Sequence, residues 1–532
     1  SFKFLLMKVR QLFVVGSIIT LVAIGVIAYY WPGILWSLII VLPIIGLGIA
    51  DMTQTKHAIR RNFPVVGHGR YLLESIRPEI MQYFVETDTE GKPIDRLMRS
   101  MVYRRAKNVI DTVPFGTQLD VYQPGYEWLN HSMYAGKIKH ADDPRVKVGG
   151  SECKQPYLAS LLNISAMSFG SLSENAVLAM NRGAKMGNFA HNTGEGGISP
   201  YHLEPGGDLI WQIGTGYFGC RAADGGFDPD KYVERASLPN VKMIELKISQ
   251  GAKPGHGGIL PANKNTPEIA KIRAVEPYTT VDSPPSHSAF SDAEGMLHFI
   301  KQLRELSGGK PIGFKLCIGI KREFIEICEA MIKTGIKPDY IAIDGGEGGT
   351  GAAPVEFSNS LGMPLLDGLA FAVDTLRGYD LKKDIRVVAS GKIISSFHIA
   401  RVMAIGADLV YSARAMMMAV GCIQALQCNT NTCPVGVATQ DRDLMKGLDV
   451  DDKSVRMYNF HKKTMHILSE LISATGVKSH RDFNRAHVNL RIDNTKVMAY
   501  DQLYPVVEVG SYVNRSADDV LVEIRQRALL KN

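Results

Sequence analysis

Tyr340–Gly351 reads YIAIDGGEGGTG, a short apolar run that passes directly into a loop made mostly of glycine. The apolar part, Tyr340–Asp344, suits a buried strand because aromatic and β-branched residues favour extended backbone. The glycine spacing in the loop matches the G-x-G-x-x-G dinucleotide fingerprint as a string, but Ala352–Val355 does not open the helix that this fingerprint requires. We therefore interpret the loop as a cradle for a flat or phosphorylated ligand at the end of a strand.

The same succession of a short apolar run and a polar, glycine-rich turn recurs on both sides of this stretch. Helical patterns such as Glu174–Met186, Asp292–Leu306, Arg322–Thr334 and Phe397–Ile405 lie between several of the runs. Eight strands and their helices over about 260 residues are typical of an α/β (β/α)8 TIM barrel, and a doubly wound open sheet is the alternative. The predicted strands are Leu162–Met167, Phe189–Thr193, Leu209–Gly214, Met243–Ile248, Ile312–Ile318, Tyr340–Asp344, Arg386–Ser390 and Leu409–Arg414.

Charged and polar residues follow or interrupt these strands. The carboxyl ends of barrel strands form the mouth where active sites lie, so this pattern predicts an enzyme rather than a binding module. Glu195 and Lys253, each inside a glycine-rich turn, could bind a dicarboxylate and relay protons, or could be ordinary loop charges. Lys315 sits mid-strand and must be either functional or part of a buried ion pair. Gly391 and the turn at Arg414 follow the last two strands, where barrels commonly bind phosphate.

Three of the seven cysteines, Cys422, Cys428 and Cys433, follow a C-x5-C-x4-C spacing. Thiolates are soft ligands that suit iron–sulfur clusters, whereas a zinc site would need a fourth ligand that the neighbouring sequence does not offer. Unrelated buried thiols are the other reading of this spacing. The odd, sparse cysteine count argues against a secreted disulfide framework.

Residues 11–50 contain no Asp, Glu, Lys or Arg. Because one span needs about 20 apolar residues, this run fits two transmembrane helices, split by Trp31–Gly33; a buried helical hairpin is the alternative. Basic residues flank both ends, including Lys3 and Lys8 before the run and Arg60 after it, which predicts a cell-membrane anchor with both flanks in the cytoplasm. The net charge of +7 over the whole chain is too diffuse to indicate nucleic-acid binding.

These patterns divide the chain into four parts. We expect a transmembrane hairpin at 1–50, a juxtamembrane arm at 51–150, the barrel with its cysteine loop at 151–435, and a C-terminal helical extension at 436–532.

Several motifs together resemble the synthase domain of glutamate synthase over about residues 150–480. The hairpin and arm resemble a membrane-tethered subgroup of FMN-binding glutamate synthase-like proteins. The motifs are SAMSFG at 165–170, TGEGG at 193–197, KISQGAKPGHGGILP at 247–261, GGTGAAP at 348–354 and GCIQALQCNTNTCPVGVATQD at 421–441.

This resemblance implies a barrel that holds FMN beside a 3Fe–4S cluster on Cys422, Cys428 and Cys433. It implies that reduced FMN delivers hydride to 2-iminoglutarate, made from 2-oxoglutarate and ammonia, with electrons exchanged with an external partner. A homo-oligomer is possible within this family pattern. By motif position, the flavin ring would be contacted by Met167, Ser168, Gln212 and Lys315, and its phosphate end would be held by Gly349, Thr350, Gly391, Ala413 and Arg414. The substrate side would be served by Glu195, Gln250 and Lys253, and Glu294 would take part in coupling ammonia delivery to the synthase site.

The chain also departs from the family pattern, chiefly on the substrate side. Ile259 replaces a Gln and His256 a Glu in the oxoacid loop, and Lys392 and Arg414 replace a Gly and a Thr in the phosphate loops. The resemblance therefore implies intact cofactor machinery and an altered substrate pocket. A membrane dehydrogenase that oxidises an amino acid or small acid and passes electrons to quinone is an alternative function, and a non-catalytic electron-transfer subunit is a third.

Overall fold

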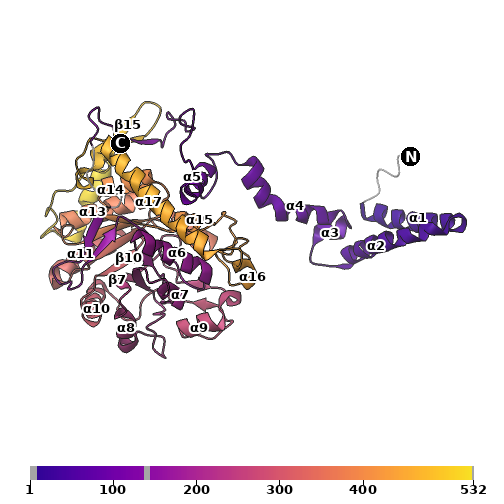
Figure 1. Cartoon of the computed structure of the whole chain (residues 1–532), viewed down its shortest axis with the longest axis horizontal. Coiled ribbons are helices and arrows are strands. Elements are labelled where there is room, and N and C mark those ends of the chain that lie inside the picture. Colours follow the sequence, from indigo (N-terminus) through magenta and orange to yellow (C-terminus); the bar gives the residue numbers. More distant parts are fainter. Residues whose placement is uncertain (1–8, 137–143, 530–532) are drawn as a thin grey trace. The chain divides into compact units, whose positions relative to one another are not determined.

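The computed structural model describes residues 9–136 and 144–529. These residues form two compact units, the first ending at Arg96 and the second beginning at Leu97 (Figure 1). The second unit carries the barrel.

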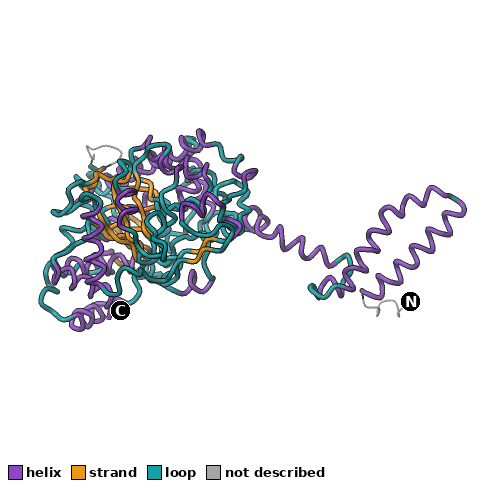
Figure 2. The backbone as a smooth tube through the Cα atoms, turned by 90° about the horizontal axis from the view of Figure 1, so that it is seen from below, coloured by secondary structure: helices purple, strands orange, loops and turns teal. Residues whose placement is uncertain are grey.

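Eight parallel strands close into a barrel in the order β4-β5-β6-β7-β10-β11-β12-β13, and β13 pairs with β4 to complete it. The predicted TIM barrel is thus confirmed and the open-sheet alternative is excluded. Figure 2 shows these strands in the interior of the second unit, with helices outside them. The strands are β4 (Leu162–Ile164), β5 (His191–Asn192), β6 (Leu209–Ile213), β7 (Val241–Lys247), β10 (Ile312–Leu316), β11 (Tyr340–Asp344), β12 (Arg386–Ser390) and β13 (Leu409–Ser412).

The outer helices bury their apolar faces against the barrel, as their 3.6-residue periodicity requires. Polar caps start several of them: the Ser173 side chain accepts a hydrogen bond from the Ala176 amide, and Asp292 accepts one from Gly295. The helices that follow strands are α6 (Glu174–Gly187), α8 (Pro229–Ala236), α10 (Ala293–Leu306), α11 (Lys321–Thr334), α13 (Leu365–Gly378), α14 (Ser396–Ile405) and α15 (Arg414–Ala419).

Residues on either side of the barrel belong to the same unit as the barrel. The strand β1 (Glu127–Leu129) pairs antiparallel with β14 (Val488–Arg491), which pairs with β15 (Val497–Ala499). Helix α5 (Arg96–Ala106) is tied to α14 and to α17 (Val450–Ala474) by Arg105, which donates to Ser396 and Thr464 hydroxyls at 3.4 Å. The compact unit that carries the barrel thus begins at Leu97, and the segment after the barrel contains strands as well as helices.

The first unit contains two helices that are long and apolar enough to cross a membrane. They span Val9–Tyr30 (α1) and Pro32–Thr53, the latter comprising η2 (Pro32–Ser37) and α2 (Leu38–Thr53), and their side chains are almost all exposed. The shorter helices α3 (Ala58–Asn62) and α4 (Gly67–Ile80) follow. The predicted flanking charges at Lys3 and Lys8 lie outside the described residues.

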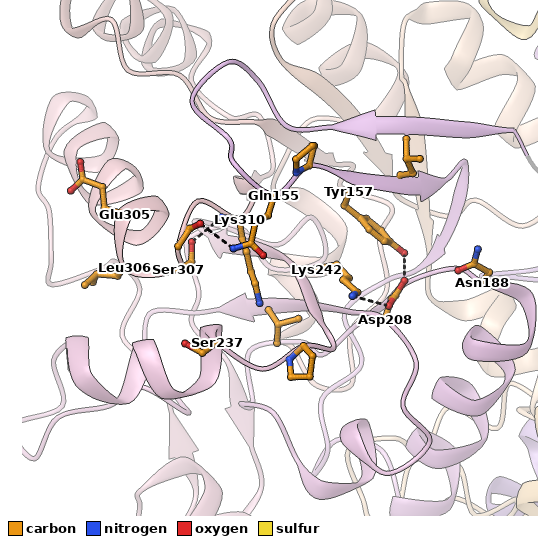
Figure 3. A pocket seen from close by; sticks show the side chains of 15 residues that line it. Gln155, Tyr157, Asn188, Asp208, Ser237, Lys242, Glu305, Leu306, Ser307 and Lys310 are labelled. Carbon is orange, nitrogen blue, oxygen red and sulfur yellow. Dashed lines mark hydrogen bonds and ion pairs between the residues drawn. The ribbon is translucent and has the colours of Figure 1, made fainter.

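A cavity of about 890 Å³ lies near the amino-terminal ends of β6, β7 and β10 (Figure 3). Tyr157 and Lys242 both reach Asp208 there, at 2.9 and 3.8 Å, as Figure 3 shows. None of the predicted site residues lines this cavity. The cavity is therefore distinct from the predicted site, whose residues lie toward the carboxyl ends of the strands.

Candidate active site

Most of the predicted site residues follow the carboxyl ends of strands, and therefore meet at one mouth of the barrel. Glu195 follows β5, Gln250 and Lys253 follow β7, and Gly349 follows β11. Gly391 follows β12, while Ala413 and Arg414 follow β13. In a closed parallel barrel these loops surround a common space, which is where barrel enzymes carry their chemistry.

A hydrogen-bonded chain of side chains crosses this mouth. The Lys247 ammonium donates to Glu195 Oε1 at 2.7 Å and to Gln250 Oε1 at 3.0 Å. Gln250 Nε2 in turn donates to the Gly349 carbonyl at 2.9 Å. These hydrogen bonds connect the loops after β5, β7 and β11. Lys247, the central residue of this arrangement, lies inside the predicted strand Met243–Ile248 and was not singled out from the sequence.

Positive charge dominates the surroundings of Glu195. Burial alone would raise the pKa of the Glu195 carboxyl, but Lys247, Lys253 and Arg273 outweigh it and lower that pKa, so the group is ionised at neutral pH. Burial, with help from Lys247, lowers the pKa of Lys253 to about 8. Three cations around one carboxylate leave a net positive site, which suits an anionic substrate.

Arg273 is a second residue that sequence reasoning did not single out. It comes from α9 (Pro267–Arg273), is only 5% exposed, and donates through Nη2 to the Phe169 carbonyl at 3.2 Å. Its Nε has no hydrogen-bond partner among the described residues, and burial lowers the pKa of the guanidinium to about 10. A buried, partly unsatisfied guanidinium is the kind of group that a carboxylate ligand completes.

The barrel interior below the mouth holds a layer of buried polar groups. Lys315 lies 3.4 Å from Asp344, and both are buried, so this mid-strand ammonium has a carboxylate partner. Gln212 and Asn192 donate to one oxygen of Glu245, at 2.7 and 2.9 Å. Burial raises the pKa of Glu245, although Lys315 opposes this. Gln212 thus faces Glu245 rather than open space, and Glu245 was missed because a strand pattern alone gave no reason to select it.

The loops after β11, β12 and β13 form a close-fitting cradle. A Cβ added at Gly349 would lie 3.1 Å from Arg414 Cδ, and Gly391 has a φ of +138°, so both positions favour glycine. Arg414 Nη2 donates to the Glu347 carbonyl at 2.6 Å. Lys392 has a φ of +50°, in the left-handed region that favours glycine. Thr350 and Ala413 lie in the same loops, half-buried.

The segment after β4 borders the same mouth. The Met167 amide donates to the Asn192 carbonyl at 3.0 Å, which ties this segment to β5. A Cβ at Gly194 would come within 2.4 Å of Ser168 Oγ, so the two glycine-rich turns are in direct contact.

Glu294 is the one predicted site residue that the structure separates from this group. It lies in the first turn of α10, on the outside of the barrel, where it forms an ion pair with Lys333 of α11.

Cys422, Cys428 and Cys433 follow α15 in a single loop. The three thiols act on one another: burial first, then the other two thiols, raise the pKa of Cys422 to about 12. The Tyr103 hydroxyl and the Lys264 ammonium donate to the carbonyls of Cys422 and Cys428, which fixes the loop. No three His, Cys, Asp or Glu side chains within residues 9–136 and 144–529 are grouped so as to hold one metal ion.

A closed parallel barrel with an ionised, cation-lined cluster at the carboxyl ends of its strands defines an enzyme of the TIM-barrel class. The profile of the conserved region in glutamate synthase matches residues 118–478. The chain belongs to this glutamate synthase family and is an oxidoreductase.

Two relatives illustrate the extent of the similarity. The chain is 36% identical over 530 residues to the glutamate synthase large subunit-like protein YerD of Bacillus subtilis (strain 168), a match that covers 92% of this chain and 97% of the relative. It is 35% identical over 356 residues to the archaeal glutamate synthase [NADPH] of Methanocaldococcus jannaschii, which covers 66% and 65% of the two chains. A solved flavocytochrome b2 mutant with pyruvate bound is 12% identical, with a TM-score of 0.39 over 79% of this chain and 84% of its own.

Proposed function

We propose that this chain is a membrane-anchored FMN and iron–sulfur oxidoreductase with glutamate synthase-type chemistry, which reduces 2-iminoglutarate, formed from 2-oxoglutarate and ammonia, to glutamate. The observation that carries the proposal is the Glu195–Lys247–Gln250 chain, which ends on the Gly349 carbonyl at the barrel mouth. In this arrangement Glu195 would transfer protons, and the neighbouring cations would bind a dicarboxylate, beside the glycine-rich loop.

The residues at the mouth fit an FMN group. Gly349, Gly391 and the Ala413–Arg414 turn would hold its phosphate, because they offer close backbone approach and a buried guanidinium. Met167, Ser168 and Lys315 would lie along the ring, by their places in the family motifs. When bound, the flavin supplies the hydride that this chemistry needs.

The chain's own side chains supply binding and proton transfer. Lys253 and Arg273 would bind the substrate carboxylates, since each is buried and Arg273 has an unsatisfied Nε. Glu195, held ionised by its neighbouring cations, would accept and return a proton at the substrate nitrogen. Gln250 would keep the Lys247 ammonium aligned with Glu195.

The cysteine loop fits a cluster better than a mononuclear site. In an iron–sulfur cluster each cysteine binds a different iron, so the thiols need not converge on one point. Buried thiols resist ionisation, as the raised pKa values of Cys422 and Cys428 show, and a bound cluster would stabilise their thiolates. We propose a 3Fe–4S cluster on Cys422, Cys428 and Cys433 that exchanges electrons with an external partner.

The anchor would be the hairpin of α1 and α2. Their length and apolar composition suit two membrane crossings. We propose that they hold the chain in the cell membrane with the barrel on the cytoplasmic side.

Isotope-labelled turnover tests the proposed reaction. Full-length protein in detergent, supplied with electrons by dithionite-reduced methyl viologen, should form 15N-glutamate from 2-oxoglutarate and 15N-ammonium. Lys247→Met should abolish this formation, while Lys333→Met on α11 should not. The apolar Ile259 in β8 (Ile259–Leu260) favours, as a second candidate, a dehydrogenase of a less polar acid. Flavin reduction by such an acid with reoxidation by quinone, and no glutamate formed, would establish that candidate instead. A flavin that responds to neither would leave an electron-transfer subunit.

The affinity for 2-oxoglutarate should fall as the pH rises through about 8. Lys253, whose folded-state pKa is about 8, is protonated below that pH and neutral above it, whereas 2-oxoglutarate remains a dianion throughout. Losing a charge-assisted hydrogen bond costs about 1.5–3 kcal/mol, so binding should weaken roughly five- to tenfold between pH 7 and pH 9, as the protonated fraction of Lys253 falls. Calorimetric titration at several pH values measures this. Lys253→Met should bind weakly at both extremes with a flat profile; a profile as steep as that of the wild type would contradict the assignment.

A further inference from the structure

Lys264 is a buried cation in the loop region that surrounds the cysteines. It ends the short helix η4 (Ala262–Lys264) and is 2% exposed. Its Nζ donates to the carbonyls of Ser171 at 2.6 Å, Ala438 at 3.1 Å and Cys428 at 3.2 Å. These three bonds use all three ammonium protons. The acceptors are neutral, however, so the hydrogen bonds satisfy the donors without neutralising the charge.

The charge of Lys264 therefore needs a partner. An isolated buried ammonium costs several kcal/mol even after the protein relaxes. Burial lowers the pKa of the Lys264 ammonium, the sulfur atoms of Cys428 and Cys433 would raise it as thiolates, and Arg273 lowers it further. None of these is a carboxylate. Arg273, a second buried cation, adds to the uncompensated positive charge around Lys264. Negative charge on Cys428 and Cys433 would compensate it.

The surrounding contacts hold Lys264 against the cysteine loop. The neighbouring Asn263 exchanges hydrogen bonds with this loop, donating to the Thr430 carbonyl at 3.3 Å and accepting from Asn431 at 3.2 Å. Through Ser171, Lys264 also reaches the segment that follows β4, in which Ser168 lies. The ammonium group is thus fixed between the cysteine loop and the flavin side of the barrel mouth.

We propose that Lys264 is the built-in counter-charge of an iron–sulfur cluster on Cys422, Cys428 and Cys433, and that it raises the reduction potential of this cluster. The inference rests on the proposed cluster. Net charge and hydrogen bonding around the sulfur atoms set such potentials. A fixed positive charge stabilises the reduced cluster, which carries one more negative charge, and so favours the arrival of an electron at the cluster.

Lys310 offers a matched control within the same barrel. It is 7% exposed and donates to two carbonyls, those of Ala236 at 2.5 Å and Leu238 at 2.9 Å. It lines the cavity at the other end of the strands, as Figure 3 shows, and not the cysteine loop. Replacing it with methionine removes a buried ammonium and leaves carbonyls unsatisfied, as the same change does at Lys264.

Redox titration of the full-length protein in detergent tests the proposal. Wild type, Lys264→Met, Lys264→Arg and Lys310→Met are compared for iron, for acid-labile sulfide and for the midpoint potential of the cluster by electron paramagnetic resonance. We expect Lys264→Met to favour the oxidised cluster at least tenfold, a lowering of about 59 mV for a one-electron couple. Lys264→Arg and Lys310→Met should stay close to wild type.

Each other outcome also has a meaning. Selective loss of iron from Lys264→Met, with iron kept in Lys264→Arg and Lys310→Met, supports the counter-charge as a requirement for holding the cluster. An unchanged potential in Lys264→Met overturns the proposal, as does an equal change in Lys264→Arg or in Lys310→Met, because shape or general packing would then be responsible. Wild-type protein without iron and sulfide would refute the proposed cluster itself.

Discussion

Cys428→Ser should remove the iron–sulfur cluster from the purified protein. A serine hydroxyl is a hard, weakly acidic ligand, and it cannot replace a soft thiolate at iron without a large loss of affinity. The Lys264 ammonium holds the loop through the main-chain carbonyl of Cys428, which the substitution keeps, so the fold should stay in place. Iron and sulfide analysis, with the visible spectrum, measures the loss.

Cys328→Ser is the control for this substitution. Cys328 is a fully buried thiol of α11, outside the cysteine loop. The Cys328→Ser variant should keep its full iron content. Its midpoint of thermal unfolding should fall somewhat, because a hydroxyl replaces a thiol in an apolar core. Equal iron in the two variants would refute the assignment of Cys428 as a ligand.

Lys315→Met should destabilise the barrel by about 3–5 kcal/mol, the usual cost of leaving one partner of a buried ion pair alone. Asp344, only 4% exposed, would lose the ammonium that lies 3.4 Å away and keep the Gly251 amide. Urea unfolding followed by near-ultraviolet circular dichroism measures the change.

Two variants separate this effect from the loss of any surface charge. Lys333→Met breaks the exposed pair with Glu294 and should cost less than about 1 kcal/mol. The double variant Lys315→Met/Asp344→Asn removes the uncompensated carboxylate and should recover part of the stability. If Lys315→Met and Lys333→Met were equally stable, the buried pair would contribute nothing beyond an exposed one.

Strand positions were predictable where apolar runs end on a sharp chemical signal. β11 and β12 have the predicted bounds, because Asp344-Gly345 and Ser390-Gly391 stop the extended run abruptly. The first two strands are shorter than predicted: β4 stops at Ile164 and β5 contains two residues. The residues after Ile164 and Asn192 belong to loops at the barrel mouth. Nothing in the local sequence indicates that the strands end there.

The candidate site was predictable only in part, for a related reason. Glu195, Gln250 and Lys253 lie in glycine-rich turns, which draw attention to any charge they carry. Lys247 and Glu245 are inside a strand, and only closure of the barrel shows that one faces the mouth and the other its interior. Glu294 was carried over from a motif, while its exposed pairing with Lys333 depends on the packing of two helices.

The pairing of β1 with β14 imposes an order on synthesis. Asn130 and Asn489, whose side chains bond at 2.6 Å beside these strands, are 359 residues apart in the chain. On the ribosome, the first strand of the barrel-bearing unit must therefore wait until nearly the whole chain has emerged before it finds its partner. An unpaired strand edge is prone to join other chains. Nascent or truncated chains that stop short of Arg491 would thus present an open edge, because β14 protects a strand that was made long before it.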